Sequence, residues 1–391
     1  MDNTKKRLKI VYLMHGDRHV GGGERILLQT IISLDRNRFR PVVLYGRRNR
    51  IIDEFEKHGI ETAKFNLGGN ISAIDRNEIN QRPFLIVINA YYLASAVFKL
   101  TRTLKGLRAD IFHPHDNLSK LIGGISGRLA GVPVISHCHD FLDSSLIERI
   151  ILFNQKFVMN RVIAVSESVR RLFGRQGKEG GKVSLIYNGL DLDRFRPGVS
   201  GLIREDLGIP DGASVISVIA MLEPIKGHRY FFEAIRKLKR ESDLKFFCIV
   251  AGEGTLAGEL ARKVEESGIE DCVKFLDLSQ DVPDLLSITD IAVMPSERES
   301  FGLAAAEAMA MKVPVIASGG SGMEEVILHG ETGVIVPSRD PEAIFRALTD
   351  LIEHSGKRKK MGEAGRLRVE KMFNIRKNAK KIEYVYMDMA G

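Results

Sequence analysis

The sequence has little of what marks a secreted, membrane-spanning or repetitive protein. It contains only three cysteines, Cys138, Cys248 and Cys272, which are scattered and odd in number. They predict no disulfide framework and fit a reducing compartment. The longest nearly uncharged run, residues 84–98, is interrupted by Asn89 and is too short to span a bilayer. No internal repeat or low-complexity tract is present, which excludes a solenoid or a disordered chain.

A signal peptide is also not expected. The first residues, MDNTKKRLKIVYLMHGD, place only a short apolar stretch after the basic ones, whereas a signal peptide needs a longer stretch. This stretch is interpreted as the first strand. The sequence therefore predicts a cytoplasmic protein that is soluble or peripheral on the inner face of the cell membrane.

Charge is distributed unevenly along the 391 residues, whose net charge is +8. Residues 1–190 carry 30 Lys and Arg against 17 Asp and Glu, and the remainder carries 28 against 33. A basic first half is typical either of a surface that attracts an anionic partner or of an ordinary solubilising surface. Nucleic acid is not expected as a partner, because the basic residues are dispersed without an aromatic stacking platform.

Short apolar runs alternate with amphipathic stretches along the whole chain, as in KIVYLMH followed by GERILLQTIISLD. This pattern predicts parallel sheets covered by helices, and it restarts after NGLDLDRFRPG. Two doubly wound Rossmann-like α/β domains are therefore expected, with ligands at the carboxyl ends of the strands, in the cleft between the domains. The predicted division is a first domain over 1–190, a linker over 191–205, a second domain over 206–370 and a C-terminal helix over 371–391.

One stretch of the second half, PSERESFGLAAAEAMAMKVPVIAS, places two acids around a predicted helix start near Phe301. A helix start offers unpaired N–H groups to an anion, and Gly302 allows close approach. Glu299 and Glu307 are placed to accept hydrogen bonds from hydroxyl groups on either side. A nucleotide sugar has hydroxyl groups on both sides of a diphosphate, so an anion site with an acid on either side suits it. By spacing alone, a solvated Glu299 and a capping or surface Glu307 are the alternative interpretation, and spacing alone does not exclude it.

The same stretch, continued to GGSGMEEVILHGETGVIVP, resembles the donor-site signature of the retaining GT-B glycosyltransferases of family 4. Four further segments resemble family elements in the same order, namely GGGERILL, NGLDLDRFRP, LEPIKGH and VAGEGTLAGEL. The resemblance covers nearly the whole chain and implies GT-B architecture, with two Rossmann-like domains facing across a cleft.

The resemblance also implies roles for particular residues. Glu299 would contact the donor sugar, Glu307 would hold the ribose hydroxyls, and Lys226 would neutralise the leaving diphosphate. His139 would lie beside the sugar, where it would hydrogen-bond it or stabilise developing charge, and it is counted with Glu299 as catalytic. The other expected donor-binding residues are Gly22, Gly23, Ser300, Phe301, Gly302 and Leu303.

Three positions depart from the family pattern. Met221 stands where an arginine often provides a second diphosphate clamp. Arg229 and a basic residue of the first domain are the two candidates for a compensating cation. Ser321 replaces one glycine of a pair, and Glu324 occupies a position where proline is frequent.

Two histidine pairs support a rival interpretation. HPHD (113–116) and HCHD (137–140) each end a predicted strand. Because side chains alternate along a strand, His113 and His115 lie on one face of the first strand, and His137 and His139 lie on one face of the second. Two such pairs suit a metal-dependent hydrolase. However, HPHDN lacks the histidine that follows the aspartate in common His-x-His-x-Asp-His sites, and no cluster of further ligands follows downstream. A dinucleotide-dependent oxidoreductase is disfavoured, because GDRHVGGGE is not a Gly-x-Gly-x-x-Gly loop. A sugar-nucleotide epimerase and a non-catalytic nucleotide-sugar binder share the architecture and stay open.

The resemblance thus predicts a retaining transferase that moves a hexosyl residue from a UDP- or GDP-linked sugar. No cofactor or metal is expected, because no Asp-x-Asp clasp accompanies the donor signature. Residues 91–108 place Lys99, Arg102 and Lys105 at three-residue spacing beside apolar positions. This is typical of a membrane-surface helix, and equally of an ordinary amphipathic helix. The first interpretation predicts a lipid-linked saccharide acceptor in envelope or exopolysaccharide biosynthesis.

Overall fold

The computed structural model of the chain describes residues 7–15, 21–66, 84–142, 146–177, 181–198, 204–277, 281–320 and 322–391. Ser321 and residues 199–203 of the predicted linker lie outside this set. The chain forms two compact units, which are described separately. The first comprises 1–186 and 376–391, and the second comprises 187–375.

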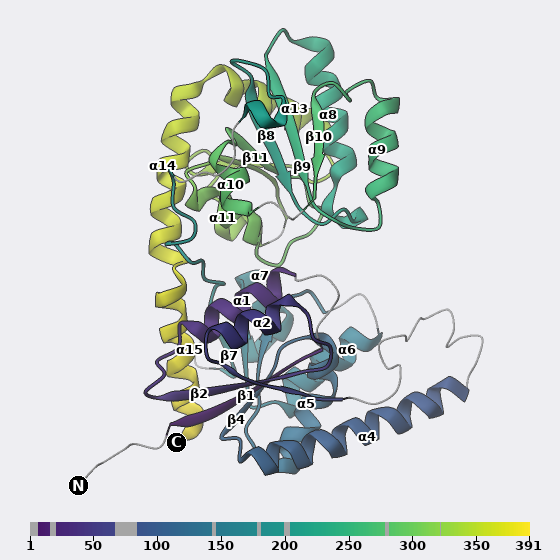
Figure 1. Ribbon diagram of the computed structural model, residues 1–391, viewed down its shortest axis with the longest axis vertical. Helices are drawn as coiled ribbons and strands as arrows, with labels where there is room; N and C mark the ends of the chain where they lie inside the picture. The colour runs from purple at the N-terminus through teal and green to yellow at the C-terminus, as the bar shows by residue number, and fades with distance from the viewer. Residues whose placement is uncertain are drawn as a thin grey trace. The chain divides into compact units, whose positions relative to one another are not determined.

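The first unit is built on parallel strands, coloured purple to teal in Figure 1. One sheet has the order β3-β2-β1-β4 and a second has the order β5-β6-β7. A parallel bridge between Phe112 and Val134 joins β4 to the second sheet. The strands are β1 (Leu8–Met14), β2 (Phe39–Tyr45), β3 (Glu61–Lys64), β4 (Ile111–Pro114), β5 (Ile135–Cys138), β6 (Arg161–Ala164) and β7 (Val183–Leu185).

Helices cover both faces of this sheet, and β1 shows why. Its side chains alternate between two apolar clusters, with Tyr12 packed in one and Val11 in the other. Helices α1 and α2 lie on one side of the sheet, and α4 and α5 lie on the other (Figure 1). The helices are α1 (Gly22–Ile32), α2 (Arg50–Lys57), α4 (Phe84–Leu107), α5 (Asn117–Ala130), α6 (Leu146–Phe153), the π-helix η2 (Asn154–Val158), α7 (Glu167–Arg170) and the 3₁₀ segment η3 (Arg171–Gly177).

The second unit repeats the plan with one parallel sheet of order β10-β9-β8-β11-β12-β13. The chain reverses direction across the sheet between β8 and β11, which is the point where such folds bind ligands. The strands are β8 (Ser214–Ile219), β9 (Phe246–Ala251), β10 (Val273–Leu276), β11 (Ile291–Met294), β12 (Val315–Ser318) and β13 (Gly333–Val336). The helices are η4 (Glu205–Leu207), η5 (Pro224–Lys226), α8 (His228–Glu241), α9 (Ala257–Glu266), α10 (Val282–Ser287), α11 (Leu303–Ala310), α12 (Met323–Val326), α13 (Pro341–Glu353) and α14 (Ser355–Met372). The predicted fold class, two doubly wound α/β domains, is confirmed.

The last helix, α15 (Ile375–Ala390), packs in the first unit, a choice that the sequence left open. It starts later than the predicted residue 371, because Leu190 exchanges backbone hydrogen bonds with Phe373 and Ile375 and so interrupts the helix. The hydroxyl of Tyr386 lies 2.8 Å from that of Tyr12 on β1. Among the described residues, no helix has the length and apolar character needed to cross a membrane.

Candidate donor site

The loop between β11 and α11 lies at the carboxyl end of the second unit's sheet. Helix α11 starts at Leu303, two residues later than the predicted start, because Gly302 adopts the left-handed conformation with φ of 91°. A Cβ atom at Gly302 would lie 2.4 Å from Sδ of Met323. Glycine is therefore required here both by conformation and by space. The backbone N–H groups of the first turn point out of the helix start, as an anion site requires.

Replacing Gly302 with Ala is expected to lower the free energy of unfolding by about 1 to 3 kcal/mol, because the left-handed backbone and the contact with Met323 both penalise a side chain. Urea denaturation would measure this. Gly258 is the matched control, since it lies inside α9 with open space around it. Its replacement by Ala is expected to stabilise the protein by up to about 1 kcal/mol. Equal effects at both positions would contradict the prediction.

Lys226 and Glu299 form an ion pair at this loop, with 2.5 Å between Nζ and Oε1. Ser296 Oγ donates a second hydrogen bond to the same oxygen, at 3.0 Å. The two charged side chains are only 22% and 20% exposed. Lys226 ends η5, and the next residue, Gly227, packs so closely on the Pro295 carbonyl that a Cβ would lie 2.1 Å from its oxygen. Because Gly227 has no side chain, η5 packs closely on Pro295, and Lys226 therefore reaches Glu299 in the loop.

The rest of the loop presents main chain. The Phe301 ring is buried, 5.3 Å from the ring of Phe373 and 6.2 Å from that of Tyr187. Gly322 donates its N–H to the Glu299 carbonyl at 2.8 Å and packs against Ser300. With its aromatic side chain anchored in the core, this segment is held in one conformation at the helix start.

Glu307 lies one turn into α11 and is 8% exposed. Its neighbours in the helix, from Ala305 to Ala310, are all buried. The structure therefore excludes the interpretation of Glu307 as a surface residue. A buried carboxylate on a buried helix requires polar partners.

The first unit brings a second set of predicted residues together. Gly22 and Gly23 form the first turn of α1, which the Glu24 carboxylate caps by accepting from Gly21 N–H at 3.2 Å. Nε2 of His115 lies 3.0 Å from the Gly23 carbonyl oxygen. The ring of His139 lies 5.0 Å from the ring of His115. His115 thus links the glycine loop to His139, the histidine that is expected to lie beside the sugar.

The other two histidines belong to a buried polar chain. Nδ1 of His137 lies 3.1 Å from Nε2 of His113, and Nδ1 of His113 lies 2.7 Å from the Tyr386 hydroxyl. The rings of His113 and His137 stack at 5.0 Å, and those of His137 and His139 at 5.1 Å. Burial lowers the pKa of His115 and His137 to about 3, and it lowers the pKa of His113 and His139 as well. All four rings are therefore neutral at pH 7.

Lys120 is a residue that the sequence analysis missed. It lies on α5, is 2% exposed, and adds a positive charge that lowers the pKa of His115, His137 and His139 further. The signal was available, since Lys120 is the only charge within NLSKLIGGISG, directly after HPHD. Within the described ranges, no group of three or more His, Cys, Asp or Glu side chains has an arrangement that would hold a metal ion. The histidines contact each other and Tyr386 instead.

Comparison with known proteins agrees with the two-unit fold. Residues 20–194 match the family described as Glycosyltransferase Family 4, and residues 200–368 match the family described as Glycosyl transferases group 1. The chain belongs to the GT-B glycosyltransferases of group 1 and family 4. The resemblance in the donor-site signature is thereby confirmed.

Individual relatives match this chain to different extents. D-inositol 3-phosphate glycosyltransferase 2 of Catenulispora acidiphila is 31% identical over 268 residues, which is 62% of this chain and 62% of that protein. UDP-Gal:alpha-D-GlcNAc-diphosphoundecaprenol alpha-1,3-galactosyltransferase of Escherichia coli is 26% identical over 309 residues, 75% of this chain and 79% of that protein. The match thus spans less than two thirds of the first relative.

Solved structures extend the likeness in fold to the whole chain. The structure of Anabaena Alr3699/HepE in complex with UDP and glucose superposes with a TM-score of 0.83 at 22% identity, covering 98% of this chain and 100% of that one. Sucrose-phosphate synthase from Thermosynechococcus elongatus superposes with a TM-score of 0.78 at 20% identity, over 98% and 99%. These similarities establish the GT-B fold.

The departures of this chain from the family pattern have structural counterparts. Met221 is 52% exposed after β8. Arg229, the residue considered as a compensating cation, donates instead to Glu297 at 2.8 Å and to the Tyr230 hydroxyl at 2.5 Å. Arg339 also pairs with Glu297, at 2.5 Å. Arg229 is therefore held by another carboxylate and does not simply replace the missing arginine.

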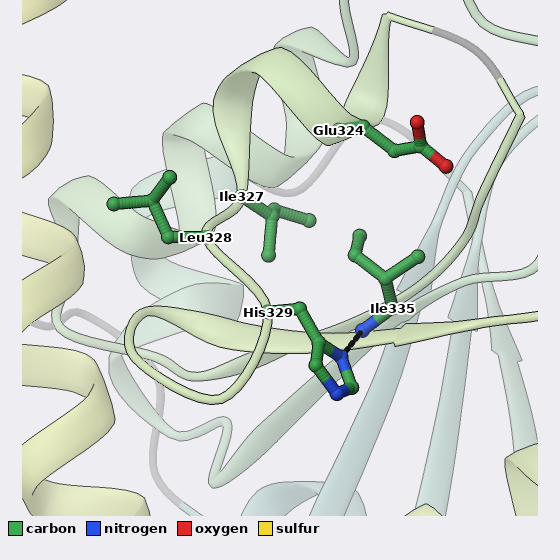
Figure 2. A pocket seen from close by; sticks show the side chains of 5 residues that line it. All are labelled: Glu324, Ile327, Leu328, His329 and Ile335. Atoms are coloured by element: carbon green, nitrogen blue, oxygen red, sulfur yellow. Dashed lines mark hydrogen bonds between the residues drawn. The ribbon is translucent and has the colours of Figure 1, made fainter.

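Glu324 stabilises the turn after β12, because its carboxylate accepts the Gly320 N–H at 2.8 Å. It also borders a shallow cavity of about 370 Å³. Figure 2 shows Ile327 and Ile335 facing this space, and Nδ1 of His329 accepting the Ile335 N–H at 3.0 Å. The acid at this position thus has a structural role that proline cannot fill.

Proposed function

We propose that this protein is a retaining glycosyltransferase that moves a hexosyl residue from a UDP- or GDP-linked sugar to a saccharide or lipid-linked saccharide. The observation that carries the proposal is the partly buried Lys226–Glu299 pair beside the start of α11. A cation and a helix start together suit a diphosphate, and a carboxylate between them suits sugar hydroxyls. Relatives whose names include a UDP-linked donor and a diphosphoundecaprenol acceptor support both substrate classes.

The chemistry proposed for these residues is electrostatic. The N–H groups at the start of α11 and the ammonium group of Lys226 stabilise the negative charge that develops on the leaving diphosphate. Glu299 and Glu307 position the sugar and ribose hydroxyls, and the neutral His139 hydrogen-bonds the sugar. Gly22 and Gly23 allow the backbone of α1 to approach the donor. The acceptor hydroxyl attacks the anomeric carbon from the face that the diphosphate leaves. The bond between that carbon and the diphosphate breaks, and the hydroxyl proton passes to the leaving diphosphate, without an enzyme nucleophile and without a divalent ion.

Transfer assays test this proposal directly. UDP-, GDP- and ADP-sugars are first screened for an increase in melting temperature, because a bound donor stabilises the folded state. The stabilising donor is then incubated with saccharide and lipid-linked acceptors, with and without a chelator. An α-linked product from an α-linked donor is expected. An inverted linkage would overturn the retaining mechanism, and chelator-sensitive hydrolysis without transfer would favour the hydrolase.

Replacing Glu307 with Ala is expected to raise the Kd for the donor by about 10- to 150-fold, the effect of losing hydrogen bonds to a charged group. Ala fits the helix, since most positions around Glu307 in α11 are already alanine. Isothermal titration calorimetry would measure the Kd, with Glu363→Ala, at an exposed position on α14, as the control. An unaltered donor Kd would show that Glu307 does not contact the ribose.

A further inference from the structure

Exposed apolar side chains are concentrated on one part of the first unit. Among the described residues, fourteen large hydrophobic side chains are exposed, and eight of them lie on α4, α5, α6 and η2. These eight are Tyr91, Phe98, Ile125, Leu129, Ile147, Ile150, Phe153 and Phe157. Single exposed apolar residues are ordinary on a soluble protein, but a cluster from neighbouring elements indicates an interaction surface.

The elements that carry these residues are neighbours, and α5 lies between α4 on one side and α6 with η2 on the other. Thr101 Oγ1 of α4 donates to the Ser126 carbonyl of α5 at 3.3 Å. On the opposite side, Asn154 Nδ2 of η2 donates to the Leu121 carbonyl of α5 at 2.9 Å. Figure 1 shows α4 and α5 running beside each other along the same side of the sheet. The eight side chains therefore belong to one layer, which we call the α4–α6 face.

The α4–α6 face is strongly basic as well as apolar. Helices α4 and α5 contain no acidic residue, and α6 with η2 contains only Glu148. Against this single acid stand Lys99, Arg102, Lys105, Lys120, Arg128, Arg149 and Lys156, of which Lys120 is the only buried one. These few elements thus supply most of the protein's net charge of +8.

Apolar and basic groups are interleaved on this face. On α4, Tyr91, Phe98, Arg102 and Lys105 recur at spacings of seven, four and three residues, which places them on one stripe. The Arg102 guanidinium lies 5.7 Å from the centre of the Phe98 ring. The rings of Phe153 and Phe157 lie 4.8 Å apart at the junction of α6 and η2. Aromatic and aliphatic side chains among cations are typical of surfaces that enter the headgroup region of a membrane.

We propose that the α4–α6 face docks on an anionic lipid bilayer, with its aromatic side chains at the acyl boundary and its cations against the phosphates. Charge complementarity selects this partner. A second copy of the chain meeting the same face would bring two basic surfaces together, which is unfavourable. The inference goes beyond sugar transfer and holds independently of it, since it concerns only where the protein binds. A lipid-linked acceptor would explain why such a face is present.

Vesicle co-sedimentation of the full chain tests this inference. Binding is expected to phosphatidylcholine vesicles in which a quarter of the lipid is phosphatidylglycerol, and not to phosphatidylcholine alone. It should weaken with added salt, because the screening length shortens. Each basic residue contributes roughly fivefold to the affinity for an anionic surface, so the triple variant Arg102→Glu, Lys105→Glu, Arg128→Glu is expected to bind roughly 100-fold more weakly. A second variant, Phe98→Ser with Phe153→Ser and Phe157→Ser, should also lose binding.

Matched controls come from α14, where Leu367, Lys359 and Lys360 are exposed. The changes Leu367→Ser, Lys359→Glu and Lys360→Glu should leave vesicle binding unchanged. Circular dichroism and the donor-induced rise in melting temperature report folding and donor binding, so failure of the proposed function is seen separately. No binding to anionic vesicles, or equal binding by the variants of the face, would overturn the inference. A dimer in sedimentation analysis that the same variants abolish would also overturn it, in favour of a second copy.

Discussion

Replacing Lys226 with Ala is expected to lower kcat/KM for the donor by about 100- to 1000-fold, the range seen when one group that stabilises transition-state charge is removed. Lys226 contacts Glu299 in the loop that leads into α11. Met221 replaces an arginine of the family pattern, and Arg229 is held by Glu297. Lys226 is therefore expected to supply a larger share of the positive charge that stabilises the leaving diphosphate. The loss should therefore lie near the upper end of the range.

The same change should have little effect on folding. The two side chains keep 22% and 20% of their surface exposed, so water can solvate Glu299 when Lys226 is removed, and the free energy of unfolding is expected to fall by about 1 kcal/mol, the upper end of the range for exposed pairs. Lys226→Ala is thus expected to lower kcat/KM strongly while the free energy of unfolding changes little. A lysine with only a structural role would lower both together. Lys226→Arg keeps the charge with a different geometry and should retain part of the activity.

Lys239 provides the control for this experiment. It lies on α8, shortly after Lys226 in the sequence, and forms a more exposed ion pair of similar length with Asp271, at 2.6 Å. Lys239→Ala removes one paired lysine from the same unit and should leave kcat/KM unchanged. Steady-state kinetics with the donor at subsaturating concentration would measure both variants. Wild-type kcat/KM in Lys226→Ala would remove the proposed diphosphate site.

Acidification from pH 7.5 to pH 5.5 is expected to lower the free energy of unfolding by about 3 kcal/mol through two buried histidines. The pKa values of His115 and His137 are lowered to about 3 in the folded protein, because burial and Lys120 disfavour the charged ring. In the unfolded chain each pKa returns to about 6.5. Between these values only the unfolded chain takes up protons, so stability is complete above pH 6.5 and is lost as the pH falls toward 3.

Each of the two histidines accounts for about 1.4 kcal/mol at one pH unit below 6.5, and His113 and His139 act in the same direction. Carboxylates contribute little in this interval, because they ordinarily titrate below it. Urea denaturation at the two pH values would measure the difference. His137→Phe should reduce the difference by about 1.4 kcal/mol. Equal stability at both pH values would show that the cluster is hydrated and titrates normally.

Much of the fold could be predicted from local sequence. The strands are short apolar runs such as IAVM and VIAS, and polar or glycine-rich residues follow them where the chain leaves the sheet. Ligand loops in parallel sheets follow the strands directly, so ERESFG could be identified as a candidate site without knowledge of strand order. The helix starts two residues later than predicted, because Gly302 has a positive φ, and the local sequence does not reveal the space beside it, which Met323 fills.

What the sequence determined by itself was therefore the alternation of elements, the two-domain plan and the positions of the loops, since these follow from periodicity and turn residues close together in the chain. Tertiary structure alone decided the pairing of Lys226 with Glu299, which are 73 residues apart, and the contact between His113 and Tyr386, which are 273 apart. It also decided that α15 packs in the first unit. Such contacts depend on which surfaces become neighbours when the sheets assemble, and no local pattern carries that information.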